Sequence, residues 1–286
     1  MRNDNENENN LPSVYAPLSI RTRQYGVCRA RKNENGTVIC ANYGQTTSLA
    51  LDPIEKKPLN MFYPGSMILS AGSYGCNLRC PFCQNHEISM ACAKDIDFVY
   101  LSPEFLVQKA AEYQAEGNIG VAFTYNEPLI GWEYVYDTAK LIKKAGMKTV
   151  LVTNGTAAPH ILDKLLPFVD AMNIDLKGYT QAYYQKLGGN LEAVKEFIQT
   201  AASGCHVELT TLIVPDENDS ITQMEEEARW IASVKTVNSS GQIPLHVTRF
   251  FPKYHMTDKE PTDVRQIHRL ADAAGKYLKN VFLGNC

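Results

Sequence analysis

The sequence predicts an α/β fold in which parallel strands alternate with helices, and three observations lead to this expectation. From Met67 onward, short apolar runs typical of strands alternate with amphipathic segments typical of helices, at intervals of roughly 25–35 residues. Such alternation implies parallel strands joined by right-handed crossovers, as in a barrel or a doubly wound sheet. Polar side chains and cysteines follow several of these strands, at the edge where parallel α/β folds build their sites. No G-x-G-x-x-G pattern follows the first strand, so a dinucleotide-binding site has no support.

The composition is that of an ordinary globular protein. Of the 286 residues, 44% are apolar and 21% are charged, which is enough for a sizeable core. The net charge of −3 gives no reason to expect nucleic acid as a partner. Neither a signal-peptide pattern nor a membrane-spanning apolar run is present, so we expect a cytoplasmic protein with no membrane partner. In that reducing compartment, clustered cysteines bind metal or do redox chemistry more often than they form disulfides.

The N-terminal part of the chain lies outside the repeating pattern. Residues 1–10 are acidic and Asn-rich, have nothing apolar to bury, and are predicted to be disordered. Residues 36–52 predict a hairpin of two short strands joined by turn residues. Residues 53–66 contain three prolines and predict an extended loop. We therefore expect a disordered start and a hairpin extension within residues 1–60, followed by the main α/β domain over residues 61–286.

Capping residues support the helices of the main domain. Ser102 is suited to an N-cap with Pro103 in the first turn, and Gly117 and Gly146 each follow a helical segment as a stop signal. The predicted strands cover residues 67–72, 119–124, 148–154, 170–176, 206–214, 244–250 and 280–284. The predicted helices cover residues 102–117, 131–146, 160–168, 190–204, 220–234 and 263–278.

Five groups of polar residues or cysteines are expected at the carboxyl ends of these strands. Because those ends share one edge in a parallel sheet, the groups should gather there, and five groups in register are hard to explain by packing. The groups are Cys76–Cys83, Asn126–Glu127, Thr153–Asn154, Asp175–Lys177 and His246.

Three cysteines at gaps of three and two residues form the most specific motif. Thiolates from Cys76, Cys80 and Cys83 can converge on one centre, and soft sulfur ligands select zinc or an iron–sulfur cluster. One alternative is a structural zinc site with His86 as the fourth ligand. If His86 is not a ligand, one position on the metal centre stays open, as chemistry at the metal requires.

The pattern C-x3-C-x-aromatic-C, formed by Cys76, Cys80, Phe82 and Cys83, resembles the signature of the radical S-adenosylmethionine (radical SAM) enzymes. Over residues 25–286 the chain further resembles the AmmeMemoRadiSam-type members, which are relatives of the pyruvate formate-lyase activating enzymes. The stretches that carry this second resemblance are "ALDPIEKKPL", "FYPGS", "CPFCQNHEIS", "FTYNEP", "DLKG", "RFFP" and "VFLGN". The resemblance implies a partial (β/α)6 TIM-like barrel, open on one side, with a short N-terminal hairpin extension.

The resemblance also implies the cofactors and the first part of their site. The three cysteines would hold three irons of a 4Fe–4S cluster, and the amino and carboxylate groups of S-adenosylmethionine (SAM) would chelate the fourth. Phe82 would pack beside the adenine. Asn126 and Glu127 occupy the place of the family's Gly-Gly-Glu strand end, with Glu127 binding the SAM amino group. As an alternative, Glu127 before Pro128 is a turn residue.

The remaining SAM contacts come from later strands. By the same resemblance Thr153, Asp175 and Lys177 would contact the methionine carboxylate or the ribose, and His246 would lie near the ribose. Two alternatives stay open. Asp175 and Lys177 point the same way from a strand and could form a local ion pair, and His246 could be a hydrogen-bonded core histidine.

The chain departs from the family pattern in two places. Members of the subgroup usually carry further N-terminal cysteines, where this chain has Ser13, Tyr15 and Ser19, with only Cys28 remaining. A second metal site there is therefore not expected. Val152 occupies the place of an aspartate that helps to bind a monovalent cation in the activating enzymes, which puts a cation site in doubt.

The other cysteines fit structural roles better than ligand roles. Cys28 and Cys40 have no neighbouring histidine, and we favour two buried thiols over a second metal site. Cys92 and Cys205 are also interpreted as structural, and Cys286 as an exposed terminal thiol.

The activity implied by the resemblance is reductive cleavage of SAM. An electron from the cluster would break the C5′–S bond, giving methionine and a 5′-deoxyadenosyl radical that abstracts hydrogen from a substrate. No side chain is assigned as a general base. The implied partners are a protein substrate and an electron donor such as flavodoxin or ferredoxin. The alternatives are a small molecule or peptide as the substrate, or an interaction protein with structural zinc.

Overall fold

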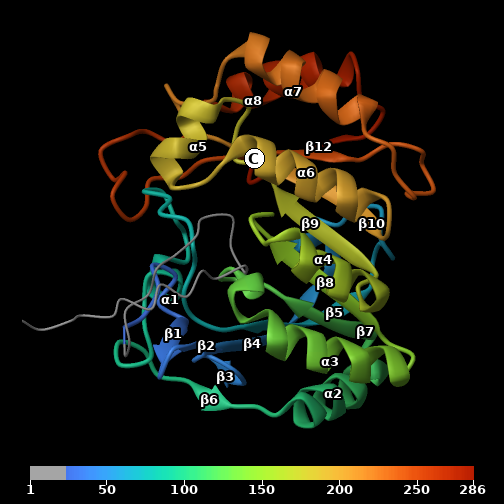
Figure 1. Ribbon diagram of the computed structural model, residues 1–286. Coiled ribbons are helices and arrows are strands. Elements are labelled where there is room, and N and C mark those ends of the chain that lie inside the picture. Colours follow the sequence, from blue (N-terminus) through green and yellow to red (C-terminus); the bar gives the residue numbers. More distant parts are fainter. Residues whose placement is uncertain (1–23) are drawn as a thin grey trace, which may run out of the picture.

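The computed structural model describes residues 24–286, and its centre is a curved eight-stranded sheet (Figure 1). The predictions for residues 1–10 and for Ser13, Tyr15 and Ser19 lie outside the described residues. The sheet has the order β12-β11-β10-β9-β8-β7-β5-β4, and every pair is parallel except β4–β5. Its strands are β4 (Ser48–Pro53), β5 (Met67–Gly72), β7 (Asn118–Phe123), β8 (Lys148–Thr153), β9 (Ala171–Asp175), β10 (His206–Ile213), β11 (Leu245–Arg249) and β12 (Val281–Gly284).

Helices follow the parallel strands and lie on the outside of the curved sheet (Figure 1). The α-helices are α1 (His86–Ser89), α2 (Pro103–Glu112), α3 (Trp132–Lys144), α4 (Pro159–Leu165), α5 (Gln181–Leu187), α6 (Leu191–Ala202), α7 (Ile221–Ser233) and α8 (Val264–Gly275). Four 3₁₀ turns are described within residues 24–286: η1 (Ile54–Lys56), η2 (Tyr113–Glu116), η3 (Pro128–Gly131) and η4 (Leu166–Phe168).

Strand order decides between the two architectures that periodicity left open. From β5 to β12 the strands stand in the sheet in chain order, so each crossover advances in the same direction. A doubly wound sheet would instead reverse its order at a switch point. Winding in one direction curls the sheet with helices on its outer face, and the edge strands β4 and β12 do not pair with each other within the described residues. The predicted partial barrel is therefore confirmed.

The predicted strands and helices of the main domain are present, with boundaries shifted by a few residues at most. The Ser102 hydroxyl accepts a hydrogen bond from the Phe105 N–H at 3.2 Å, as expected of an N-cap, and Pro103 opens α2. After η2 the chain turns at Gly117, whose φ is 87°. The helices and the sheet bury one large apolar core between them. No helix of the described residues is both long and apolar enough to cross a membrane.

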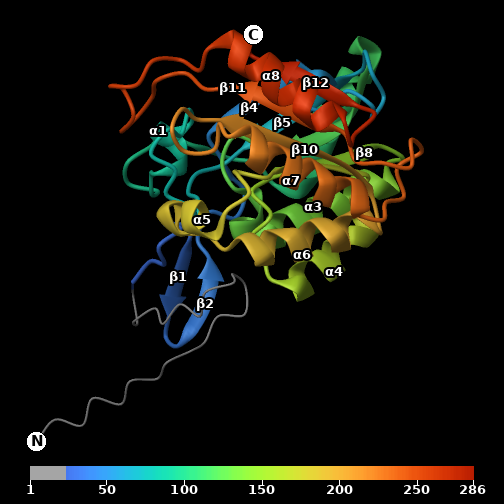
Figure 2. The ribbon, with the colours of Figure 1, turned by 90° about the horizontal axis from the view of Figure 1, so that it is seen from above.

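The predicted hairpin within residues 36–52 is wrong in its pairing. β2 (Thr37–Cys40) pairs with β1 (Arg31–Glu34), which precedes it, and β4 pairs with β5. Asn35 and Gly36, with φ of 52° and 89°, form the two-residue turn between β1 and β2. Asn-Gly favours such turns because both residues tolerate positive φ. A hairpin extension therefore exists, but it lies earlier in the chain and projects from the body of the molecule (Figure 2). A further pair of short strands joins β3 (Gln45–Thr46) to β6 (Val99–Tyr100).

The segment after β4 forms a floor under the barrel. Beyond η1, the Pro58 carbonyl accepts a hydrogen bond from Asn173 Nδ2 on β9 at 2.8 Å. The Glu208 carboxylate on β10 accepts from the backbone N–H groups of Asn60 at 3.0 Å and Met61 at 2.8 Å. The predicted loop over residues 53–66 is thus held against the inside of the sheet by hydrogen bonds to β9 and β10. β4, which precedes the predicted domain boundary at residues 60/61, belongs to the same sheet as β5, and that boundary stays a prediction.

Candidate active site in the barrel

All ten residues predicted from the sequence to bind a cluster or SAM line a single cavity of about 580 Å³ inside the barrel. They reach it from the ends of β5, β7, β8 and β9 and from β11. The floor segment contributes Lys56, Pro58 and Asn60, and the C-terminal strand contributes Leu283 and Gly284. The ten residues are Cys76, Cys80, Phe82, Cys83, Asn126, Glu127, Thr153, Asp175, Lys177 and His246.

The loop that carries the three cysteines is fixed at its start by Asn126. The Asn126 amide donates to the carbonyls of Tyr74 at 3.1 Å and Gly75 at 3.0 Å, and its oxygen accepts from the Ser73 N–H at 3.0 Å. Gly75 has φ of 87°, which allows the sharp turn directly before Cys76. Asn126 therefore holds the loop as well as lining the cavity.

The three cysteine side chains pack with Leu78, Phe82 and Phe250 in a small apolar cluster beside the cavity. Burial raises the pKa of the Cys80 thiol to about 11, although the nearby Lys177 ammonium lowers it in part. Thiols with such a pKa must lose their protons when they bind a metal, so binding would release protons.

His86 does not line the cavity with the cysteines. Its ring stacks on Tyr254 at a centroid distance of 4.7 Å, and its Nδ1 lies 3.3 Å from the Cys83 carbonyl oxygen. Within residues 24–286, no three Cys, His, Asp or Glu side chains are placed to hold a single metal ion. In a 4Fe–4S cluster each thiolate binds a different iron, so the sulfurs stand farther apart than the ligands of one zinc ion. The donor set therefore fits a cluster better than a Cys3His zinc site.

Glu127 is buried and already accepts three hydrogen bonds from the protein. Its Oε1 accepts from the Leu129 N–H at 3.0 Å and from the Thr153 hydroxyl at 2.7 Å, and its Oε2 accepts from the Asn154 N–H at 2.7 Å. Burial raises the pKa of Glu127 to about 7 despite these donors. Oε2 accepts a single bond among the described residues, and a carboxylate oxygen has two lone pairs, so it can accept another from a ligand cation.

Asp175 and Lys177 form an ion pair on the cavity wall, with Nζ and Oδ2 2.7 Å apart. Burial alone would lower the pKa of Lys177, but Asp175 and Cys80 outweigh burial and raise it, so the side chain is a cation. This wall therefore offers one positive and one negative group to a zwitterionic ligand beside the cysteines. Asp175 and Lys177 therefore line the cavity, and they also form the local ion pair that was the alternative.

The prediction that His246 lies at the carboxyl end of its strand is wrong. His246 is the second residue of β11. The sheet register explains why it still lines the cavity. Thr210 pairs with both Asp175 and His246, so the stagger of the strands places the three residues in one layer. His246 Nε2 lies 2.7 Å from Glu208 Oε2, and its ring stacks on Phe282.

Sequence reasoning did not assign a role to Asn77, Thr156, Thr210 or Asn60. Asn77 and Thr156 interact with Asn154 beside Cys76. Thr210 and Asn60 line the cavity from the barrel wall and from the floor. Thr156 lies three residues after a strand end and could have been noticed on that basis. Asn60 reaches the site through a long-range crossing of the chain, for which the local sequence has no signal.

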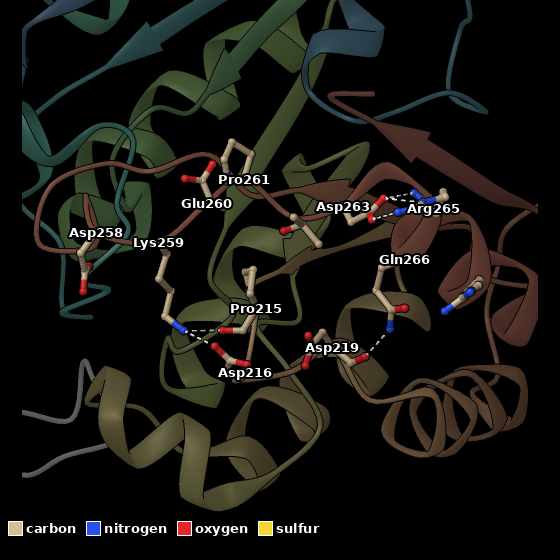
Figure 3. Close-up of a pocket in the computed structure, with 12 residues that line it drawn as sticks. Pro215, Asp216, Asp219, Asp258, Lys259, Glu260, Pro261, Asp263, Arg265 and Gln266 are labelled. Carbon is tan, nitrogen blue, oxygen red and sulfur yellow. Dashed lines mark hydrogen bonds and ion pairs between the residues drawn. The ribbon is translucent and has the colours of Figure 1, made fainter.

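A larger hollow of about 660 Å³ lies elsewhere, between the loops that follow β10 and β11 (Figure 3). Two ion pairs lie among its charged residues. Lys259 contacts Asp216 at 2.9 Å and the Pro215 carbonyl at 2.7 Å, and Arg265 contacts Asp263 at 2.9 Å. It contains no cysteine or histidine, so the barrel cavity is the better candidate for the active site.

Comparison with known proteins agrees with this geometry. A profile of the radical SAM superfamily matches residues 71–245, which is more than half of the chain and includes the three cysteines. The chain belongs to the radical SAM superfamily. Radical SAM proteins use a 4Fe–4S cluster and SAM, so the predicted family and cofactors are confirmed.

Relatives of this radical SAM protein include activating enzymes. An uncharacterized protein of Methanocaldococcus jannaschii is 38% identical over 93% of this chain and 78% of its own length. The pyruvate formate-lyase-activating enzyme of Clostridium pasteurianum is 26% identical, over 72% of this chain and 88% of the enzyme. Among solved structures, Streptococcus suis SuiB bound to S-adenosylmethionine has a TM-score of 0.58 at 15% identity, covering 77% of this chain and 52% of SuiB. At this identity the likeness to SuiB shows the fold alone.

Proposed function

We propose that the chain is a radical SAM enzyme of the activating type, which generates a radical on a partner protein. The observation that carries this proposal is the cavity. Three cysteines, a buried carboxylate and an Asp–Lys pair line one cavity, and His86 does not line it. When bound, the cluster would supply the electron that cleaves SAM reductively, and the adenosyl fragment would abstract hydrogen from the substrate.

The chain's own residues would bind and orient the two groups. Cys76, Cys80 and Cys83 would hold three irons, leaving the fourth for SAM. Glu127 would accept a hydrogen bond from the SAM ammonium through Oε2, and Lys177 would attract the methionine carboxylate. Phe82, buried beside the cysteines, would exclude water from the cluster side of the cavity.

Asp175, Thr153 and His246 would complete the SAM site. Asp175 and His246 share one layer of the barrel and would bind the hydroxyl groups of the ribose. The Thr153 hydroxyl donates to Glu127 and so keeps its carboxylate oriented for the ligand. Asn126 would act through the cysteine loop, which its amide holds in place.

A protein substrate is supported by two findings. Pyruvate formate-lyase-activating enzymes are similar to this chain over most of its length, and their name states that they act on another enzyme. The barrel is also open between β4 and β12, and Leu283 of β12 is 40% exposed while lining the cavity. A small redox protein such as flavodoxin or ferredoxin would supply the electron.

The proposal is tested by anaerobic reconstitution with iron and sulfide. Wild-type protein should hold about four irons per chain and, with SAM and dithionite, release 5′-deoxyadenosine. The variant with Cys76, Cys80 and Cys83 all changed to Ala should lose both properties. His86→Ala, the matched control, should keep both, because SAM and not His86 would fill the fourth position. Stoichiometric zinc in the wild-type protein, lost in His86→Ala, would instead establish the structural zinc site.

A further inference from the structure

The side chain of Asn154 contacts a sulfur of the cysteine motif. Asn154 follows β8, is 5% exposed, and places its Nδ2 3.7 Å from Cys76 Sγ. The backbone N–H of Leu78 lies 3.4 Å from the same sulfur. Two N–H donors therefore converge on Cys76. Sulfur is large, so hydrogen bonds to it are longer than those to oxygen.

The orientation of the Asn154 amide follows from its other partners. Its Oδ1 accepts from the Thr156 backbone N–H at 3.1 Å and from the Thr156 hydroxyl at 2.5 Å. Its Nδ2 also donates to Asn77 Oδ1 at 2.9 Å. Rotating the amide by half a turn would lose these bonds and set an oxygen against the sulfur. The N–H edge therefore faces Cys76.

The same side chains connect the end of β8 to the cysteine loop. Asn77, the neighbour of Cys76, donates from Nδ2 to the Thr156 hydroxyl at 2.6 Å, which closes a ring of three polar side chains. Asn154 and Thr156 are 5% and 4% exposed, so water competes little for these bonds. The Asn154 backbone N–H is held in turn by Glu127. The amide is thus a fixed donor and not a mobile surface group.

A donor aimed at a cluster thiolate affects the electron transfer that starts the chemistry. Reduction adds negative charge to the cluster, and part of that charge lies on the cysteine sulfurs. An N–H dipole directed at a sulfur therefore stabilises the reduced state more than the oxidised state, which raises the reduction potential. For a cluster that must accept an electron from a soluble protein, such a bond makes reduction easier.

We propose that Asn154 is a positioning residue for the cluster, whose amide N–H donates to the Cys76 thiolate, orients that ligand and raises the reduction potential. The inference rests on the proposed function, because it takes Cys76 to be an iron ligand. It assigns to Asn154 an effect on the cluster that is separate from SAM binding.

The test compares Asn154→Leu with Asn173→Leu after anaerobic reconstitution. Both substitutions replace a buried asparagine by a neutral side chain of similar size, but Asn173 contacts the floor carbonyl of Pro58 and no cysteine. The midpoint potential is measured without SAM by EPR-monitored redox titration. Asn154→Leu should hold as much iron as the wild-type protein and have a more negative potential, whereas Asn173→Leu should keep the wild-type potential. In D2O, the deuteron coupling of the reduced cluster should weaken only in Asn154→Leu.

An iron-replete Asn154→Leu protein with the wild-type potential and deuteron coupling would overturn the inference. If Asn154→Leu does not fold, Thr156→Val keeps the shape of Thr156 but removes the hydroxyl that orients the amide. It should shift the potential in the same direction by a smaller amount, and a wild-type potential in that variant would equally overturn the inference. Wild-type protein that holds zinc and no cluster would overturn the proposed function itself. The metal content of the wild-type protein is measured first, so this outcome is distinguished from a failure of the inference about Asn154.

Discussion

At the scale of single residues, Glu127 combines a local structural role with a position suited to a ligand. Its carboxylate holds the first N–H of the turn after β7 and the end of β8, and it also faces the cavity. A buried polar group needs hydrogen-bond partners whether or not a ligand is bound. The structural contacts of Glu127 and a role in SAM binding are therefore compatible.

Glu127→Gln should weaken SAM binding by roughly 10- to 100-fold, because a charge-assisted hydrogen bond to the SAM ammonium contributes about 1.5–3 kcal/mol. The pKa of about 7 adds a pH dependence. Below that pH the wild-type carboxyl takes up a proton, so SAM affinity should fall by up to about tenfold per pH unit, and Glu127→Gln should lack this dependence. SAM titrations followed by the EPR spectrum of the reduced cluster measure both effects.

The control for that experiment is Glu227→Gln, the same change at a buried glutamate outside the cavity. It should leave SAM affinity at the wild-type value. Equal SAM affinity in Glu127→Gln and wild-type protein, with iron content unchanged, would show that Glu127 does not bind SAM. Its role would then be limited to the turn.

Glu227 itself should limit stability at alkaline pH. It is 2% exposed, lies on α7, and accepts one described hydrogen bond, from the Thr211 hydroxyl at 2.5 Å. Burial raises the pKa of Glu227 to about 8. Because the folded pKa exceeds the unfolded value, the proton is bound more tightly in the folded state, and stability is lost as the pH rises from about 4.5 towards 8. Between about pH 6 and about pH 9 the free energy of unfolding of the wild-type protein should fall by about 2–3 kcal/mol more than that of Glu227→Gln. Urea unfolding at both pH values measures the difference, and parallel losses in the two proteins would contradict the assignment.

The identities of the residues around the cavity could be predicted from the sequence, but their partners could not. Cys76, Cys80 and Cys83 stand out through their spacing, and Glu127 through its place after a strand. The contact between Asn154 and Cys76 joins residues 78 positions apart, and the pairing of His246 with Glu208 spans 38. Such contacts depend on the stagger of the sheet, which hydrophobic periodicity does not determine.

At the scale of elements, the N-terminal hairpin supports the start of the cysteine loop. Cys28 and Ala30, which lead into β1, pack with Tyr74 and Ile130 in a separate apolar cluster. Cys28 is buried as predicted and has a packing role, whereas Cys40, predicted to be buried as well, is only partly buried. Gly75 lies between this cluster and Cys76, and a β-carbon there would stand 2.4 Å from the Cys28 carbonyl oxygen.

Gly75→Ala should therefore disturb the cysteine loop. The substitution imposes left-handed strain of about 1–2 kcal/mol and adds a clash with backbone that cannot move without shifting the hairpin. We expect lower iron content after reconstitution and a lower melting temperature. Gly65→Ala is the matched control, because Gly65 has φ of 81° but open space around it. If the two variants are equally destabilised, strain in φ explains the whole effect and the hairpin does not clamp the loop.

The long amphipathic helices and the apolar strands could be predicted because their signal is local. Asn190 caps α6 and Ser102 caps α2 through hydrogen bonds that involve residues three positions away. α5 escaped prediction, because its seven residues follow the Asp175–Lys177 strand end without a long apolar repeat. The pairing of β4 with β5 could not be predicted, because the alternative partner β2 was closer in sequence.

At the scale of the whole molecule, the barrel is open between β4 and β12, and the floor segment is hydrogen-bonded to β9 and β10. Seven parallel strands described in residues 67–284 would leave the amino end of the barrel open, but residues 58–62 cross it. The tie is Glu208, whose side chain is fully buried and whose carboxylate also contacts His206 and His246. Burial alone would raise the pKa of Glu208, but bonds from His206, His246 and Met61 outweigh it and lower the pKa to about 2. The floor anchor is therefore a carboxylate throughout the physiological pH range.

Glu208→Gln should release the floor. The amide nitrogen cannot accept from a backbone N–H, so at least one of the bonds from Asn60 and Met61 is lost, and each charge-assisted bond contributes about 1.5–3 kcal/mol. Hydrogen exchange of a peptide that covers Asn60–Tyr63 should become roughly 10- to 100-fold faster, because local opening there needs less free energy. Exchange in the cysteine loop, at the other end of the barrel, should change little, and Asn173→Leu should accelerate the floor peptide less because it removes one neutral bond. If the floor exchanges at the wild-type rate in Glu208→Gln, apolar packing of Leu59 and Phe62 against Ile68 and Ala171 holds it instead, and the buried carboxylate serves only to bind His206 and His246.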